Sequence, residues 1–155
     1  MDLTKILTIS GKSGLYKLLA NNKNNIIVEA LKDKRRYPIF SNEKISSLEE
    51  ISIYTETGDI PLKDVFVLLY KHTKHQPVDQ IIIKDNKLLY ELFNEFLPEY
   101  DKDLVFHSHM KKICQWYNEL LSVGIINEEV VEENNEKIEE EDKNSQENSE
   151  NKIEK

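Results

Sequence analysis

Histidines and aspartates that stand close together are the residues of this sequence nearest to a reaction centre. Asp101, Asp103, His107 and His109 are near neighbours along the chain, and histidine with aspartate is a common acid–base combination. Such chemistry needs hydrogen-bond distances, which closeness in sequence does not supply. We find no catalytic motif, so an enzyme using His107 or His109 with Asp101 or Asp103 is the least favoured alternative.

Two closely spaced histidine pairs have spacings that zinc sites use. His72 and His75 end one predicted helix, and His107 and His109 begin another. A zinc site needs three or four converging ligands, and the single cysteine, Cys114, falls among the apolar residues of a predicted helix, as expected of a small core residue. We therefore predict no metal and no cofactor.

The string Ser10-Gly11-Lys12-Ser13-Gly14 is similar to part of a phosphate-binding loop. That motif needs a glycine at position 6, where this chain has Ile6, and a helix directly after it. A strand is predicted there instead, so we expect a plain turn.

The chain has the composition expected of a cytoplasmic protein. One cysteine cannot form an intramolecular disulfide. The first residues lack the basic and apolar regions of a signal peptide. No apolar stretch reaches the roughly 20 residues of a membrane helix, so we expect no membrane association.

Basic residues are concentrated in the first part of the chain. Residues 1–45 hold nine basic and four acidic side chains, a net charge of +5. Small β-domains often bind RNA or single strands through basic tips and exposed aromatic residues. The densest cluster is at a predicted hairpin tip, where we expect contact with RNA or another anionic ligand through Lys32, Lys34, Arg35, Arg36 and Tyr37.

The acidity of the chain lies in its last part. Residues 127–155 hold twelve acidic residues and four lysines, which accounts for the whole net charge of -8. Few apolar residues and no aromatic ones occur there, so we predict a disordered acidic tail over 127–155. The tail is either a solubilising extension or an autoinhibitory mimic that competes with an anionic partner for the basic region.

The elements that position these residues form an α+β body. Short β-branched runs separated by turns predict a small curved antiparallel sheet or an SH3-like barrel. We expect strands over residues 15–19, 26–31, 35–40 and 51–55, a turn or strand over 45–48, and a short helix over 2–9. With a helix over 61–72, introduced by residues 58–61, these make a first domain, 1–72.

The second part of the body is predicted to be helical. Apolar residues recur every three or four positions over 88–97 and 110–121, with Ser108 as the expected cap of the last helix. The polar stretch 73–78 is the predicted boundary, and the helical domain is expected to cover 80–124. Trp116 is expected to pack into the core of this domain.

Four segments carry a resemblance to a known family: residues 9–18, 48–55, 97–101 and 111–118. Together they resemble an uncharacterised family common in Bacteroidetes that consists of two consecutive domains of unknown function. The resemblance covers about residues 1–122. It implies domain limits and no active site.

The leading hypothesis from the sequence is a non-catalytic cytoplasmic binding or adaptor protein that contacts RNA or another anionic ligand through the basic tip. The alternative is a protein–protein interaction module without nucleic-acid affinity. The partner itself, RNA or a protein, stays unknown at this point.

Overall fold

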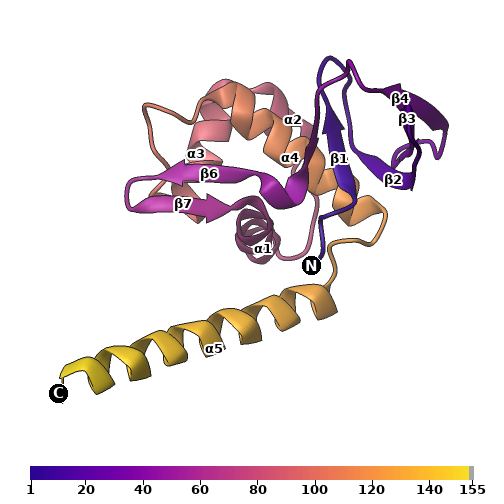
Figure 1. The fold of residues 1–155 in the computed structure, drawn as a ribbon. Helices are drawn as coiled ribbons and strands as arrows, with labels where there is room; N and C mark the ends of the chain where they lie inside the picture. The colour runs from indigo at the N-terminus through magenta and orange to yellow at the C-terminus, as the bar shows by residue number, and fades with distance from the viewer. Residues whose placement is uncertain (154–155) are drawn as a thin grey trace.

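The computed structural model describes residues 1–153, apart from the side chains of residues 138, 142 and 145–153. A β-rich part and a helical part lie side by side, and a long last helix runs along one side of them (Figure 1). This confirms the predicted α+β body.

Five short strands form an antiparallel sheet in the order β4-β3-β2-β1-β5. Because β4 and β5 remain its two edges, the sheet is not closed. Of the two forms predicted, the open antiparallel sheet is the one observed, and the SH3-like barrel is not confirmed. The strands are β1 (Ile6–Ile9), β2 (Tyr16–Asn21), β3 (Asn25–Ala30), β4 (Arg36–Phe40) and β5 (Ile45–Ser47).

The helix predicted over residues 2–9 is wrong, because Ile6–Ile9 is strand β1. Both faces of this strand are buried: Ile6 joins the main core, and Leu7 and Ile9 join a second cluster within the sheet. A strand buried on both faces shows a continuous apolar run rather than alternation. Here Ile6 and Leu7 also lie three and four residues after Leu3, which is the spacing of a short helix and explains the error.

A separate two-stranded hairpin follows the sheet. It consists of β6 (Ser52–Thr55) and β7 (Gly58–Pro61). We expected residues 58–61 to open the next helix. Instead they pair with β6, and Pro61 becomes the residue that caps helix α1. A short 3-10 helix, Leu48–Glu50, joins β5 to this hairpin.

Four helices complete the body: α1 (Leu62–His72), α2 (Gln80–Lys84), α3 (Asn86–Phe96) and α4 (His107–Ser122). The other three predicted helices correspond to α1, α3 and α4, while α2 was not predicted. Asp79 and Asp85 accept hydrogen bonds from the first turns of α2 and α3, the usual role of an N-cap aspartate. The cap of α4 is Phe106, so Ser108 does not have the predicted role.

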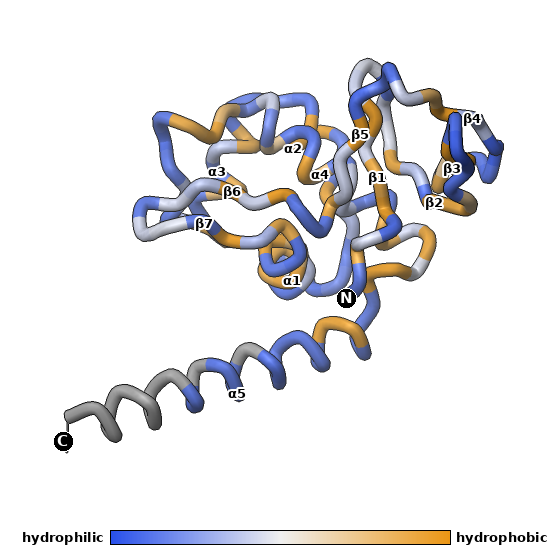
Figure 2. Tube along the Cα trace, in the orientation of Figure 1, coloured by the Kyte–Doolittle hydropathy of each residue, from blue (hydrophilic) through white to orange (hydrophobic). Residues whose placement is uncertain are grey.

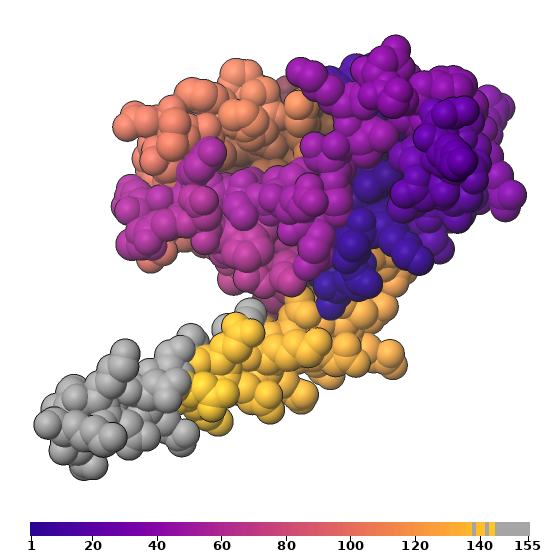
Figure 3. Space-filling view, viewed as in Figure 1, coloured from indigo at the N-terminus to yellow at the C-terminus, as the bar shows by residue number. Residues whose placement is uncertain are grey.

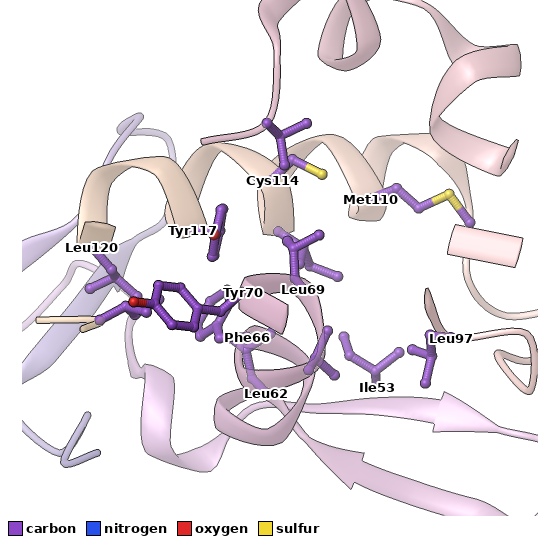
Figure 4. Packing of buried hydrophobic residues seen from close by; sticks show 14 of the residues in the cluster. Ile53, Leu62, Phe66, Leu69, Tyr70, Leu97, Met110, Cys114, Tyr117 and Leu120 are labelled. Atoms are coloured by element: carbon purple, nitrogen blue, oxygen red, sulfur yellow. The ribbon is translucent and has the colours of Figure 1, made fainter. Parts of the chain in front are cut away.

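The main core lies between α1, α3, α4 and the β6–β7 hairpin. Figure 4 shows Cys114 of α4 above Leu69 of α1, with Ile53 of β6 beside Leu97 in the same cluster. Cys114 is fully buried, as expected. Helix α1 of the predicted first domain shares this cluster with α3 and α4 of the predicted second domain. The division of the body into two domains, 1–72 and 80–124, therefore stays a prediction.

Helix α5 (Glu128–Ile153) occupies the tail, where we expected disorder. Its first turns are packed against the body, with Val131 and Asn134 buried. Figure 3 shows the N-terminal residues against the start of this helix, where the Met1 nitrogen donates to Asn134 Oδ1 at 2.9 Å. From Glu136 onward every described side chain is exposed, and Figure 2 shows the change from apolar to hydrophilic residues.

The packed structure therefore continues for about two helical turns beyond residue 127, where the tail was predicted to begin. None of the described helices is both long enough and apolar enough to span a membrane.

Candidate functional site

A groove between strand β6 and the first half of helix α4 is the main candidate site. Its walls are mostly apolar and include Leu104, Val105, Ile113 and Trp116. Its volume is about 270 Å³, just below the range of about 300–1,000 Å³ typical of drug-sized ligands. The groove therefore suits a few protruding side chains better than a whole small molecule.

Large apolar side chains are exposed around this groove. Tyr54 is 52% exposed, while Leu104 and Phe106 are each 48% exposed. They are three of only six large apolar residues in that state among the described residues. Tyr54 and Leu104 line the groove, and Phe106 lies beside it, with its ring 5.7 Å from that of the groove residue His109. Such a concentration of exposed apolar surface is typical of interaction sites.

Strand alternation places Tyr54 at the surface. Ile53 points into the core and is buried, so its neighbours Ser52 and Tyr54 point to the opposite, solvent side. The connector after α3 then pairs with the end of β6: the N–H of Asp101 donates to the Tyr54 carbonyl at 2.9 Å, and Tyr100 bridges to Thr55. This pairing holds the connector that carries Leu104 beside the strand.

The residues considered for catalysis have structural contacts instead. Asp101 Oδ1 accepts the N–H of Asp103 at 2.8 Å, which tightens the connector into a turn. His109 Nδ1 accepts the N–H of Phe106 at 3.1 Å and so caps α4. The N–H of His107 donates to Tyr90 Oη at 3.3 Å. Within the described residues, no hydrogen bond or ion pair joins either histidine to Asp101 or Asp103, and only His109 lines the groove.

The basic tip lies elsewhere, at the β3–β4 hairpin. Its four basic side chains are exposed. Two of them face acids: Arg36 Nε is 3.5 Å from Glu29 Oε2, and Arg35 Nε is 3.7 Å from Asp33 Oδ2. Surface pairs of this kind are weak, about 0–1 kcal/mol, so the arginines can exchange partners. The structure thus leaves Lys32, Lys34, Arg35 and Arg36 exposed at this hairpin.

Tyr37 does not share this exposure. It is half-buried, and its ring packs edge-on against Tyr16 with 6.3 Å between the centroids. The Lys12 ammonium lies 6.0 Å from the Tyr37 centroid. The Tyr37 ring is therefore only partly accessible for stacking with a nucleic-acid base.

The other histidines and the glycine-rich segment have contacts that do not form a binding site. His72 Nε2 is 3.0 Å from Glu95 Oε2, and the His75 ring stacks on Tyr70 at 4.2 Å. No group of three or more potential metal ligands occurs in the part of the chain that the structure describes. The glycine-rich segment is a turn between β1 and β2, with left-handed Gly11 and Gly14. A larger hollow of about 430 Å³ lies at the β2–β3 turn, and four asparagines of that turn are among its lining residues.

Comparison with known proteins adds the family. Residues 3–48 match "Domain of unknown function (DUF5606)" and residues 51–120 match "Domain of unknown function (DUF6852)". A solution NMR structure of a structural-genomics target from Bacteroides vulgatus is 37% identical, with a TM-score of 0.68 over 81% of this chain and 90% of that chain. The chain belongs to this family of two consecutive domains of unknown function. No curated protein matches it.

The family limits assign each candidate site to one domain. The groove residues, from Ile51 to Trp116, all fall in the second domain. The basic tip falls in the first. The groove was not foreseen, because its walls come from segments about fifty residues apart; the one available signal was Tyr54 at a solvent-facing position of an alternating strand.

Proposed function

We propose that this protein is a non-catalytic protein-binding module that uses the groove between β6 and α4. The observation that carries the proposal is the half-exposure of Tyr54, Leu104 and Phe106 around an apolar groove. Full burial of one such side chain contributes roughly 1.5–3 kcal/mol. A partner that covered all three would bind through a compact apolar centre, as protein interfaces commonly do.

The surroundings of the groove support binding rather than catalysis. Asp101 and His109 already serve the turn and the helix cap that shape it. Trp116 is partly buried at the wall, and tryptophan is enriched among the residues that dominate binding energy. The proposal keeps the cytoplasm as the compartment, on the composition argument given above.

The test is co-purification of the full chain from its native cells. Leu104→Asp places a charge on the groove and is expected to abolish recovery of the partner. Ile81→Asp is the matched control, because Ile81 is 70% exposed and does not line the groove. Recovery of the same partner by both variants would contradict the proposal.

The groove also carries its own reporter. Trp116 is the single tryptophan of the chain, so its fluorescence is expected to shift when the purified partner is added. No shift on binding would place the interface elsewhere.

The second candidate function is anion binding at the basic tip, as predicted from the sequence. The observation in its favour is that Lys32 and Lys34 are exposed and have no carboxylate of the described residues within ion-pair distance. Because the Tyr37 ring is half-buried, binding there would depend on phosphate contacts rather than on stacking.

A further inference from the structure

The edge of strand β6 that borders the groove has a definite polarity. In the β6–β7 pair, Ile53 stands opposite Ile60 and Ser52 opposite Pro61. The carbonyl of Tyr54 points away from β7, since it accepts the N–H of Asp101. The carbonyl of Ile51 points the other way, to the N–H of Leu62. Backbone groups alternate along an antiparallel pair, so the N–H and carbonyl of Ser52 point outward.

The chain's own pairing with this edge stops before Ser52. Residues 99–101 bond to Tyr54 of β6 and to Glu56, just after the strand. The N–H groups of Leu104 and Val105 then donate to the carbonyl of Asp101, which turns the chain away from the strand. The edge at Ser52 therefore borders the groove. An edge with outward donor and acceptor groups is a template for the addition of another strand.

The charges of the groove select a class of occupant. Its ionisable lining residues, besides the Tyr54 phenol, are His109 and Lys112. Lys112 is exposed, and no carboxylate among the described residues lies within ion-pair distance of it. A carboxylate on the ligand would be complementary to the charge of Lys112. An added strand would also direct alternate side chains toward the apolar wall at Leu104 and Trp116.

We infer that the groove binds an extended peptide segment with alternating apolar residues and a carboxylate, whose backbone pairs with β6 at Ser52. This inference rests on the proposed function and specifies its partner. The carboxylate lies by Lys112, and the apolar side chains cover Leu104 and Trp116.

The first test is selection of random twelve-residue peptides displayed on phage against the full chain, with removal of those that also bind Leu104→Asp. We expect peptides with apolar residues at alternate positions and an acidic residue. Enriched peptides with apolar residues spaced three and four apart would overturn strand addition while leaving the groove as a binding site. If no enriched peptide depends on Leu104, both the inference and the proposed function fail.

The second test probes the backbone pairing with a selected synthetic peptide. Single N-methylation is expected to weaken binding about tenfold at the one position whose N–H donates to the Ser52 carbonyl, and little at the positions on either side, because one lost hydrogen bond of about 1.4 kcal/mol is a factor of ten. Equal effects at successive positions would overturn the inference.

A third test probes the charge. Lys112→Glu is expected to weaken the same peptide about tenfold or more in low salt, whereas Lys111→Glu, one residue earlier on α4 and outside the groove lining, leaves its affinity within about twofold. Equal losses in both variants would overturn the assignment of the carboxylate to Lys112.

Discussion

Glu119 of helix α4 accepts the backbone N–H of Leu15 with its Oε2 at 3.0 Å. The bond joins the end of the second family domain to the residue just before β2 in the first. Leu15 is almost fully buried, so its N–H has little access to water and depends on this carboxylate. The two domains are thus connected by a side chain as well as by a shared apolar core.

Burial gives Glu119 a measurable influence on stability. Desolvation raises the pKa of this carboxyl, against the lowering effects of the Leu15 hydrogen bond and of Lys32. A folded-state pKa above the unfolded value means that the folded protein binds the proton more tightly. The contribution of Glu119 to stability is therefore greatest at low pH and falls as the pH rises from about 4.5 through the raised folded pKa.

We expect Glu119→Gln to remove this pH dependence while keeping an acceptor for Leu15. The difference in unfolding free energy between wild type and variant, from urea titrations at pH 4 to 8, should move in favour of the variant as the pH rises. Glu91→Gln, an exposed change on α3, is the control and should show no such trend. A constant difference across the range would contradict the role given to Glu119.

Gly14 is the residue that leaves room for this bond. A Cβ at position 14 would lie 3.1 Å from Glu119 Oε1, and Gly14 has a left-handed φ of +85°. We expect Gly14→Ala to displace the carboxylate and leave the Leu15 N–H without a partner. That loss costs roughly 1–3 kcal/mol, beyond the strain of about 1–2 kcal/mol that alanine has in this conformation.

Gly11→Ala is a matched control for the strain alone. Its φ is +80° and nothing lies within 4 Å of the added Cβ. Chemical denaturation should therefore show a smaller loss of stability for Gly11→Ala than for Gly14→Ala. Equal losses would mean that the Glu119 contact has no energetic weight.

The thiol of Cys114 is expected to report on the integrity of the core. Burial raises its pKa to about 12, and the thiolate is the reactive form. At pH 8 the folded protein should react with iodoacetamide only through opening, so addition of urea to the unfolding midpoint should accelerate labelling strongly. Fast labelling of the folded protein would show that α4 is not packed as described. The chain has no second thiol, so the signal needs no assignment.

The helices and strands that could be predicted are those whose residue pattern is set by interactions between neighbours in the sequence. Strands β2, β3 and β4 alternate or are β-branched, and α3 has a regular apolar stripe, so local chemistry was sufficient. Strand β7 was missed because Gly58 and Pro61 are poor strand formers, and only pairing with β6 makes them one. The exposure of Lys32 and Lys34 was predictable because both were placed at the tip of a hairpin.

The groove could not be predicted in the same way. Its opposite walls, at Tyr54 and Leu104, are brought together by the pairing of residues 99–101 with β6. Nothing in either segment alone indicates that pairing. The half-burial of Tyr37 likewise depends on Tyr16, which lies two strands away.

The parts of the tail before and after about residue 136 are expected to contribute differently to stability. Val131 and Asn134 are buried against the body, whereas the described side chains from Glu136 onward are exposed. Removal of residues 136–155 should change the melting temperature little. Removal of 127–155 also exposes the surface beneath Val131, and should lower stability by roughly 1.5–3 kcal/mol.

Hydrogen exchange gives an independent measure of the same division. The described side chains beyond residue 136 are exposed, and an exposed helix is marginal in water, so the amides of this segment should exchange much faster than those of α4. Similar protection along the whole of α5 would contradict the division and the expected disorder of the outer tail.

The basic tip is best tested through its salt dependence. If Lys32 and Lys34 contact phosphates, the logarithm of the affinity for single-stranded RNA, measured by filter binding, should fall linearly with the logarithm of the salt concentration. The double change Lys32→Glu and Lys34→Glu should reduce the slope of that line by about 0.7 per lysine. Lys84→Glu and Lys87→Glu, two exposed lysines in the other domain, form the control pair and should leave the slope unchanged. If removal of residues 127–155 also raises the affinity at low salt, the acidic tail competes for the tip. Absence of RNA binding at about 50 mM salt would exclude the nucleic-acid function and leave the groove as the proposed binding site.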